Sequence, residues 1–186
     1  MKTLKTILDQ DRTDLAKLFK GAGVEVGVAQ GRFAGHILGT NPGVTMLYGV
    51  DPYKPLRDYR DYTKISTFQK LKDDAYERVK PFGNRHEFLH TISMEAVKQF
   101  NDDYLDFVYI DGNHDYDHVT EDITEWLKKL KPGGIMSGDD YAKLKGRGDD
   151  YMVIEAVNDY VSKNQIPELF IYKARKHPSS WMFYKP

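Results

Sequence analysis

The sequence predicts an α/β fold: one domain with a mostly parallel sheet, one antiparallel strand near the C-terminus, and helices on both faces. Strand-like and helix-like segments alternate five times, as they do when right-handed crossovers join parallel strands. Residues 105–110 form a mostly β-branched and aromatic run, which is typical of a strand buried inside such a sheet. The 186 residues contain no repeat, low-complexity segment or linker, so a single domain over residues 1–186 is expected.

In the first half of the chain, apolar periodicity defines the elements, and glycine or proline ends them. Gly21 closes a predicted amphipathic helix over residues 2–20, with a break between Asp9 and Asp14 as the alternative, and Pro81 closes a long polar helix over residues 65–80. The other predicted elements are a strand at 24–28, a helix at 32–39, a strand at 45–50 and a Tyr- and Arg-rich loop at 54–64.

The second half repeats the alternation and then closes with two strands. Short strands are predicted at 86–90, 105–110 and 135–137, with helices at 94–100, 116–130 and 151–163 and a Gly-, Lys- and Arg-containing loop at 142–150. Strands at 169–173 and 181–184 are joined by a short turn, so these two must be antiparallel.

Composition excludes several classes of function. Lys and Arg total 27 against 28 Asp and Glu, a net charge of −1 that gives no reason to expect nucleic acid or a membrane as partner. The absence of cysteine excludes disulfides, thiolate zinc sites and cysteine nucleophiles. The charged N-terminal residues lack the apolar region of a signal peptide, which predicts a cytoplasmic protein. A small molecule is the expected partner, and a homodimer is considered as the oligomeric state.

Glycines and acids follow the first two predicted strands. Gly27 and Gly31 do not form a dinucleotide fingerprint, because Ala29 and Arg32 occupy its other glycine positions, and no P-loop is present. Asp51 ends the second strand, where an acid typically binds ribose hydroxyls. The pattern predicts a ribose-bearing ligand without a pyrophosphate to hold. A structural tight turn and a strand-end cap are the alternative explanations.

These motifs, taken in order, resemble class I S-adenosylmethionine-dependent methyltransferases over nearly the whole chain. The resemblance rests on Glu25-x-Gly27-x-x-x-Gly31 and on residues 48–51, 106–116 and 130–135. Residues 109–116 with 137–141 resemble the methyltransferase-24 type, a small-molecule branch similar to metal-dependent O-methyltransferases of sugar or polyphenol hydroxyls. The resemblance implies a Rossmann-like, seven-stranded sheet and an S-adenosylmethionine-dependent methyltransferase.

The resemblance also implies roles for individual residues. The implied cofactor residues are Glu25, Gly27 and Gly31 at the methionine end, Asp51 and Pro52 at the ribose, Ser93 and Met94 at the adenine, and Asp111 near the methyl-donor sulfur. Asp111, Asp139 and Asp140 are implied as ligands of a divalent metal, expected to be Mg²⁺. His114, with Asp111 as the second catalytic residue, is implied as the general base.

Elementary chemistry agrees with this assignment. The carboxyl ends of neighbouring strands would bring Asp111, Asp139 and Asp140 together, where their charges would repel without a cation. A hard divalent ion takes oxygen ligands and can stabilise an alkoxide, and His114 can take a proton near neutral pH. The predicted reaction is O-methylation of a small hydroxylated acceptor such as a sugar or glycan. Solvated acids and a structural histidine are the plainer explanations. A metal-independent methyltransferase and a non-catalytic cofactor-binding domain are the alternative functions.

Overall fold

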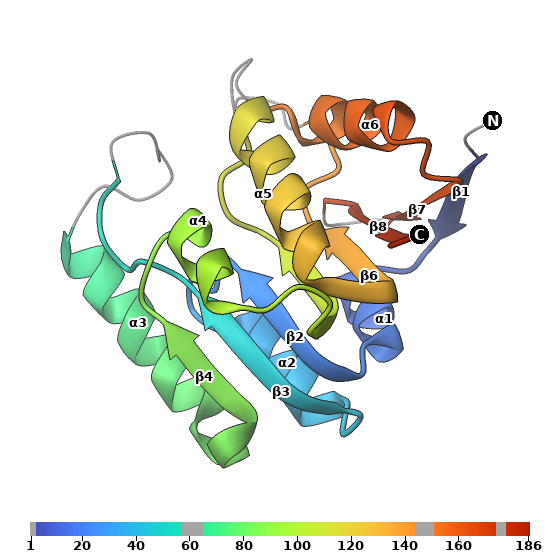
Figure 1. Cartoon of the computed structure of the whole chain (residues 1–186). Coiled ribbons are helices and arrows are strands. Elements are labelled where there is room, and N and C mark those ends of the chain that lie inside the picture. The colour runs from blue at the N-terminus through green and yellow to red at the C-terminus, as the bar shows by residue number, and fades with distance from the viewer. Residues whose placement is uncertain (1–2, 57–64, 144–150, 174–177) are drawn as a thin grey trace.

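The protein is built around an eight-stranded sheet (Figure 1). This computed structural model describes residues 3–56, 65–143, 151–173 and 178–186. The strand order is β1-β7-β8-β6-β5-β2-β3-β4. All neighbours are parallel except β8, which runs antiparallel to β6 and β7. The strands are β1 (Thr3–Leu8), β2 (Gly21–Val26), β3 (Val44–Val50), β4 (His86–Leu89), β5 (Leu105–Ile110), β6 (Leu130–Gly138), β7 (Glu168–Lys173) and β8 (Ser180–Tyr184).

The mostly parallel sheet is confirmed, but the predicted count of seven strands is wrong, because a strand precedes the expected set. Residues 2–20 were predicted as one helix, whereas residues 3–8 form β1 and pair in parallel with β7. Only α1 (Arg12–Leu15) and a following 3-10 turn are helical, and α1 begins at an Asp11 capping box. Leu4 and Leu8 are exposed and only Ile7 of this strand is half-buried, so pairing with the distant β7, and not a buried apolar face, makes the segment a strand.

Helices cover both faces of the sheet (Figure 1). One core lies under α4 (Ser93–Ala96), α5 (Tyr116–Lys129) and α6 (Val153–Lys163), and the other under α1, α2 (Arg32–Thr40) and the end of α3 (Ile65–Val79). In Figure 1, α5 crosses in front of the sheet and α2 lies behind it. Parts of the two predicted loops, residues 57–64 and 144–150, lie outside the described residues.

Strand β5 is buried on both faces and holds the site residues that follow it. It lies between β2 and β6, and Phe107 and Tyr109 are fully buried. The Asp111 N–H donates to the Val26 carbonyl at 2.7 Å, so the hydrogen-bond ladder continues one residue beyond the strand. The backbone of Asp111 is therefore fixed by the sheet.

The strand order places the predicted site residues along one edge. Strands β6, β5, β2, β3 and β4 are successive neighbours and parallel, so their carboxyl ends lie side by side. Asp139, Asp111, Gly27 and Asp51 follow the first four of these strands, and residues 92–94 follow β4. In the described part of the chain, no helix has the length and apolar character needed to cross a membrane.

Candidate functional site

A cavity of about 350 Å³ opens at this carboxyl edge, with α3 and α5 contributing to its walls. Six predicted cofactor residues line it, whereas Glu25 and Gly31 are not in its lining. The lining residues include Gly27, Asp51, Pro52, Ser93, Met94, Asp111, Glu121 and Asp122. The structure thus brings most of the predicted cofactor residues to one hollow.

Gly27 is required by its surroundings. Its φ is +87°, and a Cβ there would lie 2.0 Å from the Asp111 carbonyl oxygen. Gly31, at φ +68°, is the N-cap of α2, and a Cβ there would lie 3.0 Å from Ala75 Cα. The first glycine lets two strand ends approach each other beside the cavity, and the second lets α2 pack against α3.

Asp51 connects the ends of β2 and β3. Its Oδ2 accepts hydrogen bonds from the N–H groups of Val28 (3.1 Å) and Ala29 (2.9 Å), and its Oδ1 accepts one from Tyr53 (2.9 Å). Burial raises the pKa of Asp51, and these backbone hydrogen bonds oppose that rise. The Asp51 carboxylate is therefore held rigidly at the cavity wall, as a group that binds ribose hydroxyls needs to be.

Glu25 lies within β2 and is only 1 % exposed. Its Oε2 has no hydrogen-bond partner among the described residues. Burial raises the pKa of Glu25 well above its usual value, and nearby Asp111 adds to the rise while Arg12 opposes it. A buried acceptor without a donor is costly, so an incoming cationic group would relieve it.

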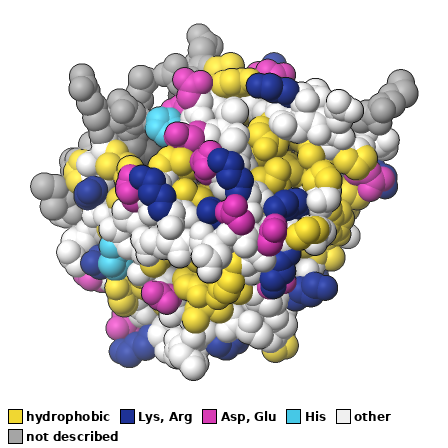
Figure 2. All heavy atoms as spheres, in the orientation of Figure 1, with side chains coloured by type: hydrophobic (Ala, Val, Ile, Leu, Met, Phe, Trp, Pro, Cys, Tyr) yellow, Lys and Arg dark blue, Asp and Glu magenta, His cyan; other side chains and the backbone are white. Residues whose placement is uncertain are grey.

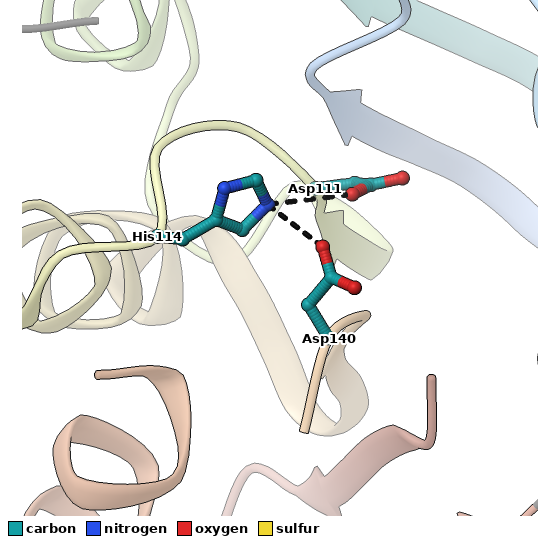
Figure 3. Close-up of side chains that lie close together, drawn as sticks. All are labelled: Asp111, His114 and Asp140. Atoms are coloured by element: carbon teal, nitrogen blue, oxygen red, sulfur yellow. Dashed lines mark ion pairs between the residues drawn. The ribbon is translucent and has the colours of Figure 1, made fainter. Parts of the chain in front are cut away.

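Asp111, His114 and Asp140 point toward one another (Figure 3). His114 Nε2 lies 2.8 Å from Asp140 Oδ2 and 4.0 Å from Asp111 Oδ1. Burial alone would lower the pKa of His114, but its interactions with Asp111 and Asp140 raise it to about 9. The His114 ring also stacks on Tyr151, with centroids 4.6 Å apart. The cluster joins a candidate base to two carboxylates.

The Asp139 side chain is not part of this cluster. Its Oδ2 accepts a hydrogen bond from Arg12 Nη1 at 2.9 Å, and its Oδ1 accepts one from Ser180 Oγ at 2.9 Å. Burial raises the pKa of Asp139 to about 6, with Asp111 adding to the rise and Arg12 opposing it. Of the three predicted metal ligands, Asp111 and Asp140 share the cluster with His114, whereas Asp139 is held by Arg12 and Ser180.

Sequence reasoning missed Arg12. Its Nη1 donates both to Asp139 and to Asp111 Oδ2 (3.2 Å), and its guanidinium lies 5.1 Å from the Phe33 ring centroid. Arg12 is 99 residues from Asp111 in the chain and follows a strand that was itself missed, so no local signal marks it.

Sequence reasoning also missed Asp122, although a signal was present. Asp122 stands three residues after Val119 and four before Trp126, on the apolar face of α5. It is 5 % exposed, and its Oδ1 accepts a hydrogen bond from Ser93 Oγ. Ser93 Oγ in turn accepts one from Trp126 Nε1 at 2.8 Å. Burial raises the pKa of Asp122 to about 7, although the Ser93 hydrogen bond opposes the rise.

Comparisons with solved structures show the same fold in several proteins. The O-methyltransferase from Bacillus cereus in complex with SAH has a TM-score of 0.62 and 13 % identity, covering 89 % of this chain and 74 % of that one. A putative rRNA-methylase from Clostridium thermocellum has a TM-score of 0.64 and 13 % identity, covering 94 % and 95 %. Spermidine synthase from Thermotoga maritima has a TM-score of 0.65 and 14 % identity, covering 95 % and 58 %.

No curated protein matches the sequence. A family model described as a methyltransferase domain matches residues 24–141, which include the glycine loop, Asp51, the Asp111–His114 turn and Asp139–Asp140. The chain therefore belongs to the methyltransferase-24 family of class I S-adenosylmethionine-dependent methyltransferases.

Proposed function

We propose that this protein transfers the methyl group of S-adenosylmethionine to a hydroxyl oxygen of a small acceptor, such as a sugar or glycan, with the help of a divalent metal ion. One observation carries the proposal: Asp111 both lines the cavity and belongs to the cluster with His114 and Asp140. A methyl donor bound in the cavity would thus end beside a candidate base.

The residues present suit the cofactor. Gly27 leaves no side chain between the cavity and the backbone of Asp111, and Asp51 offers a fixed carboxylate for ribose hydroxyls. Glu25 Oε2, which has no hydrogen-bond partner among the described residues, would suit the ammonium group of the methionine moiety.

The cluster also fits a divalent ion. Asp111, His114 and Asp140 each offer one ligand atom, all within 4.8 Å of one another. Mg²⁺ prefers oxygen ligands, so Asp111 and Asp140 would hold it, and Asp139 could join only after release from Arg12. When bound, such an ion lowers the pKa of an acceptor hydroxyl and orients its oxygen.

His114 is proposed to take the acceptor proton. The carboxylates of Asp111 and Asp140 hold a proton on His114, whose pKa is about 9. With a cation on these two carboxylates, they would no longer hold that proton, and the neutral His114 imidazole could accept one from the acceptor hydroxyl. Methyl transfer would then be in line from sulfur to oxygen: the new C–O bond would form as the S–CH₃ bond breaks, His114 would hold the acceptor proton, and S-adenosylhomocysteine would leave.

A small acceptor is proposed rather than a nucleic acid. The net charge is −1. On the face shown in Figure 2, Lys and Arg side chains are interspersed with Asp and Glu and form no patch of one sign. Phosphate-backbone binding requires clustered positive charge.

Metal-independent methyl transfer is the second candidate, and Arg12 favours it. The Arg12 guanidinium already supplies positive charge to Asp111 and Asp139, which is part of what a metal would do.

Two measurements on the purified protein test these proposals. Calorimetric titration with S-adenosylhomocysteine, with and without Mg²⁺, should show binding, and no binding at millimolar ligand would overturn the cofactor assignment. Release of S-adenosylhomocysteine should then be measured over a panel of hydroxylated acceptors, with and without EDTA. Loss of turnover with EDTA, restored by Mg²⁺, supports the metal, whereas undiminished turnover supports the second candidate. Cofactor binding without turnover on any acceptor would indicate a non-catalytic domain.

A further inference from the structure

We infer that two copies of this protein pair through β1, edge to edge and antiparallel, to form a dimer with one continuous sheet. Figure 1 shows β1 as the outermost strand, at one margin of the sheet. This surface lies away from the proposed catalytic site, because β7, β8 and β6 stand between β1 and β5. Pairing of the two copies therefore requires neither cofactor nor acceptor.

The outer edge of β1 presents backbone groups that no strand among the described residues pairs with. At either end of this segment, the N–H groups of Thr3 and Asp9 donate toward β7. Backbone groups of alternate residues point to the same side of a strand, so those of Leu4, Thr6 and Leu8 point away from β7. The strand contains no proline or glycine that would blunt this edge. The outer edge of β1 is therefore a template on which another strand can form hydrogen bonds.

The side chains on one face of this edge are apolar and exposed. Leu4 is 53 % exposed and Leu8 is 67 % exposed. The residue beside Leu4 in β7 is Leu169, which is fully buried in the core under α6. The apolar face thus continues past the cover of α6 to the margin of the sheet. A second copy that brought its own two leucines to this edge would remove all of them from water.

Charge and apolar matching select one register for this pairing. A two-fold axis perpendicular to the sheet keeps the α6-covered faces of both copies on the same side. With Thr6 on the axis, Leu4 of each copy faces Leu8 of the other, and the facing residues exchange N–H···O bonds through their outward backbone groups. With Lys5 on the axis, two ammonium groups would face each other, and with Ile7 there, both leucines would face polar residues. The register centred on Thr6 is therefore the complementary one.

The geometry of this dimer has two consequences. One strand from each copy makes a small interface, so the dimer should dissociate on dilution. The axis turns one copy by half a turn in the plane of the sheet, so the carboxyl edges of the two copies point in opposite directions. The cavity lies at that edge, beyond β6 as counted from β1, and both cavities therefore stay open in the dimer.

Sedimentation equilibrium between about 1 µM and about 1 mM protein tests the pairing. We expect the wild type to change from monomer to dimer within this range. Leu4→Glu/Leu8→Glu places acids opposite each other and should weaken the dimer at least about tenfold. Leu4→Lys/Leu8→Glu charges the same two positions but brings opposite charges face to face, so it should dimerise at least about tenfold more tightly than the two-glutamate variant. Leu18→Glu, at an exposed leucine outside β1, should dimerise as the wild type does.

A wild type that stays monomeric at the highest concentration would overturn the inference, as would a two-glutamate variant that dimerises normally or a Leu18→Glu variant that does not. Equal dimerisation by the two double variants would mean that Leu4 and Leu8 do not face each other, which also overturns it. Species larger than a dimer that grow with concentration would mean that β1 adds to the opposite edge strand, β4, of another copy, and the two-fold pairing would then be wrong.

Circular dichroism checks that each variant is folded. Should a double variant not be, Thr6→Pro is the second variant. Proline removes the outward N–H on the axis and no hydrogen bond to β7, and edge strands tolerate it at such a position. The same loss of the dimer is expected, and a Thr6→Pro protein that dimerises as the wild type does would contradict pairing through this edge.

Discussion

Asp122→Asn should change how the stability of the unliganded protein depends on pH. In the folded protein, burial raises the pKa of Asp122 from 3.8 to about 7. Between these two values the folded state keeps a proton that the unfolded state has lost. The contribution of Asp122 to stability is therefore fully present below pH 3.8 and is lost as pH rises through 7. At about 1.4 kcal/mol per pH unit, the loss amounts to about 4 kcal/mol.

An asparagine at this position cannot titrate, so the variant escapes this loss. The difference in unfolding free energy, variant minus wild type, should rise by about 4 kcal/mol between pH 4 and pH 7.5 and then level off. Taking the difference removes the contribution of every other titrating group that the two proteins share.

Urea denaturation at four or five pH values provides the assay. Both tryptophans, Trp126 and Trp181, are buried, so their fluorescence reports unfolding. Ser93→Ala is the matched variant, because it removes the hydrogen bond that holds the pKa of Asp122 down and should extend the pH-dependent range above 7. A difference between Asp122→Asn and wild type that is the same at every pH would refute the reasoning, since it would mean that folding does not desolvate this carboxylate.

Three further predictions concern single positions. Burial lowers the pKa of His86 to about 4, so the wild type should lose about 3 kcal/mol as pH falls from 6.5 to 4, and His86→Phe should lack this loss in urea titrations at matched pH. His114→Ala should lower turnover about 10²- to 10⁴-fold while calorimetry shows S-adenosylhomocysteine affinity within about twofold, and turnover equal to wild type would exclude it as the base. Gly27→Ala should destabilise the protein by more than about 1–3 kcal/mol in urea, because its Cβ would overlap the Asp111 carbonyl at a positive φ. Gly112→Ala is its control, since a Cβ there would meet Val26 Cγ1 at an ordinary 3.5 Å, and equal losses in both variants would contradict the argument.

Local pattern predicted the central elements well because β5 is almost entirely buried and α5 has one apolar, buried face. The strand at 105–110 is β5, and the helix predicted over 116–130 is α5 (Tyr116–Lys129). The strand predicted at 135–137 begins earlier, at Leu130, and includes Pro132 and Gly133, two residue types that usually end a helix. Pairing between Leu105 and Leu130 holds its first residue in the sheet. Stop signals end a helix, but they do not say where the next strand starts.

The site was predictable where it follows strand ends and unpredictable where distant segments meet. Asp51 and Asp111 could be placed at the carboxyl edge because each directly follows a buried strand. Whether Asp139 or His114 would share a cluster with Asp140 depended on side-chain direction, which strand position alone does not give. The partner of Asp139, Arg12, comes from a segment whose strand forms only by pairing with β7.

Arg12 connects the rim of the sheet to its centre. It stands four residues beyond Leu8, the end of the outermost strand, yet its charge lies between two central carboxylates. Loss of the Arg12 guanidinium would leave Asp111 and Asp139 to repel each other. Proteolytic clipping that removes residues up to and including Arg12 would thus remove the positive charge between Asp111 and Asp139. Truncation of the N-terminal segment through Arg12 is expected to remove the ion pairs that Asp111 and Asp139 make with Arg12.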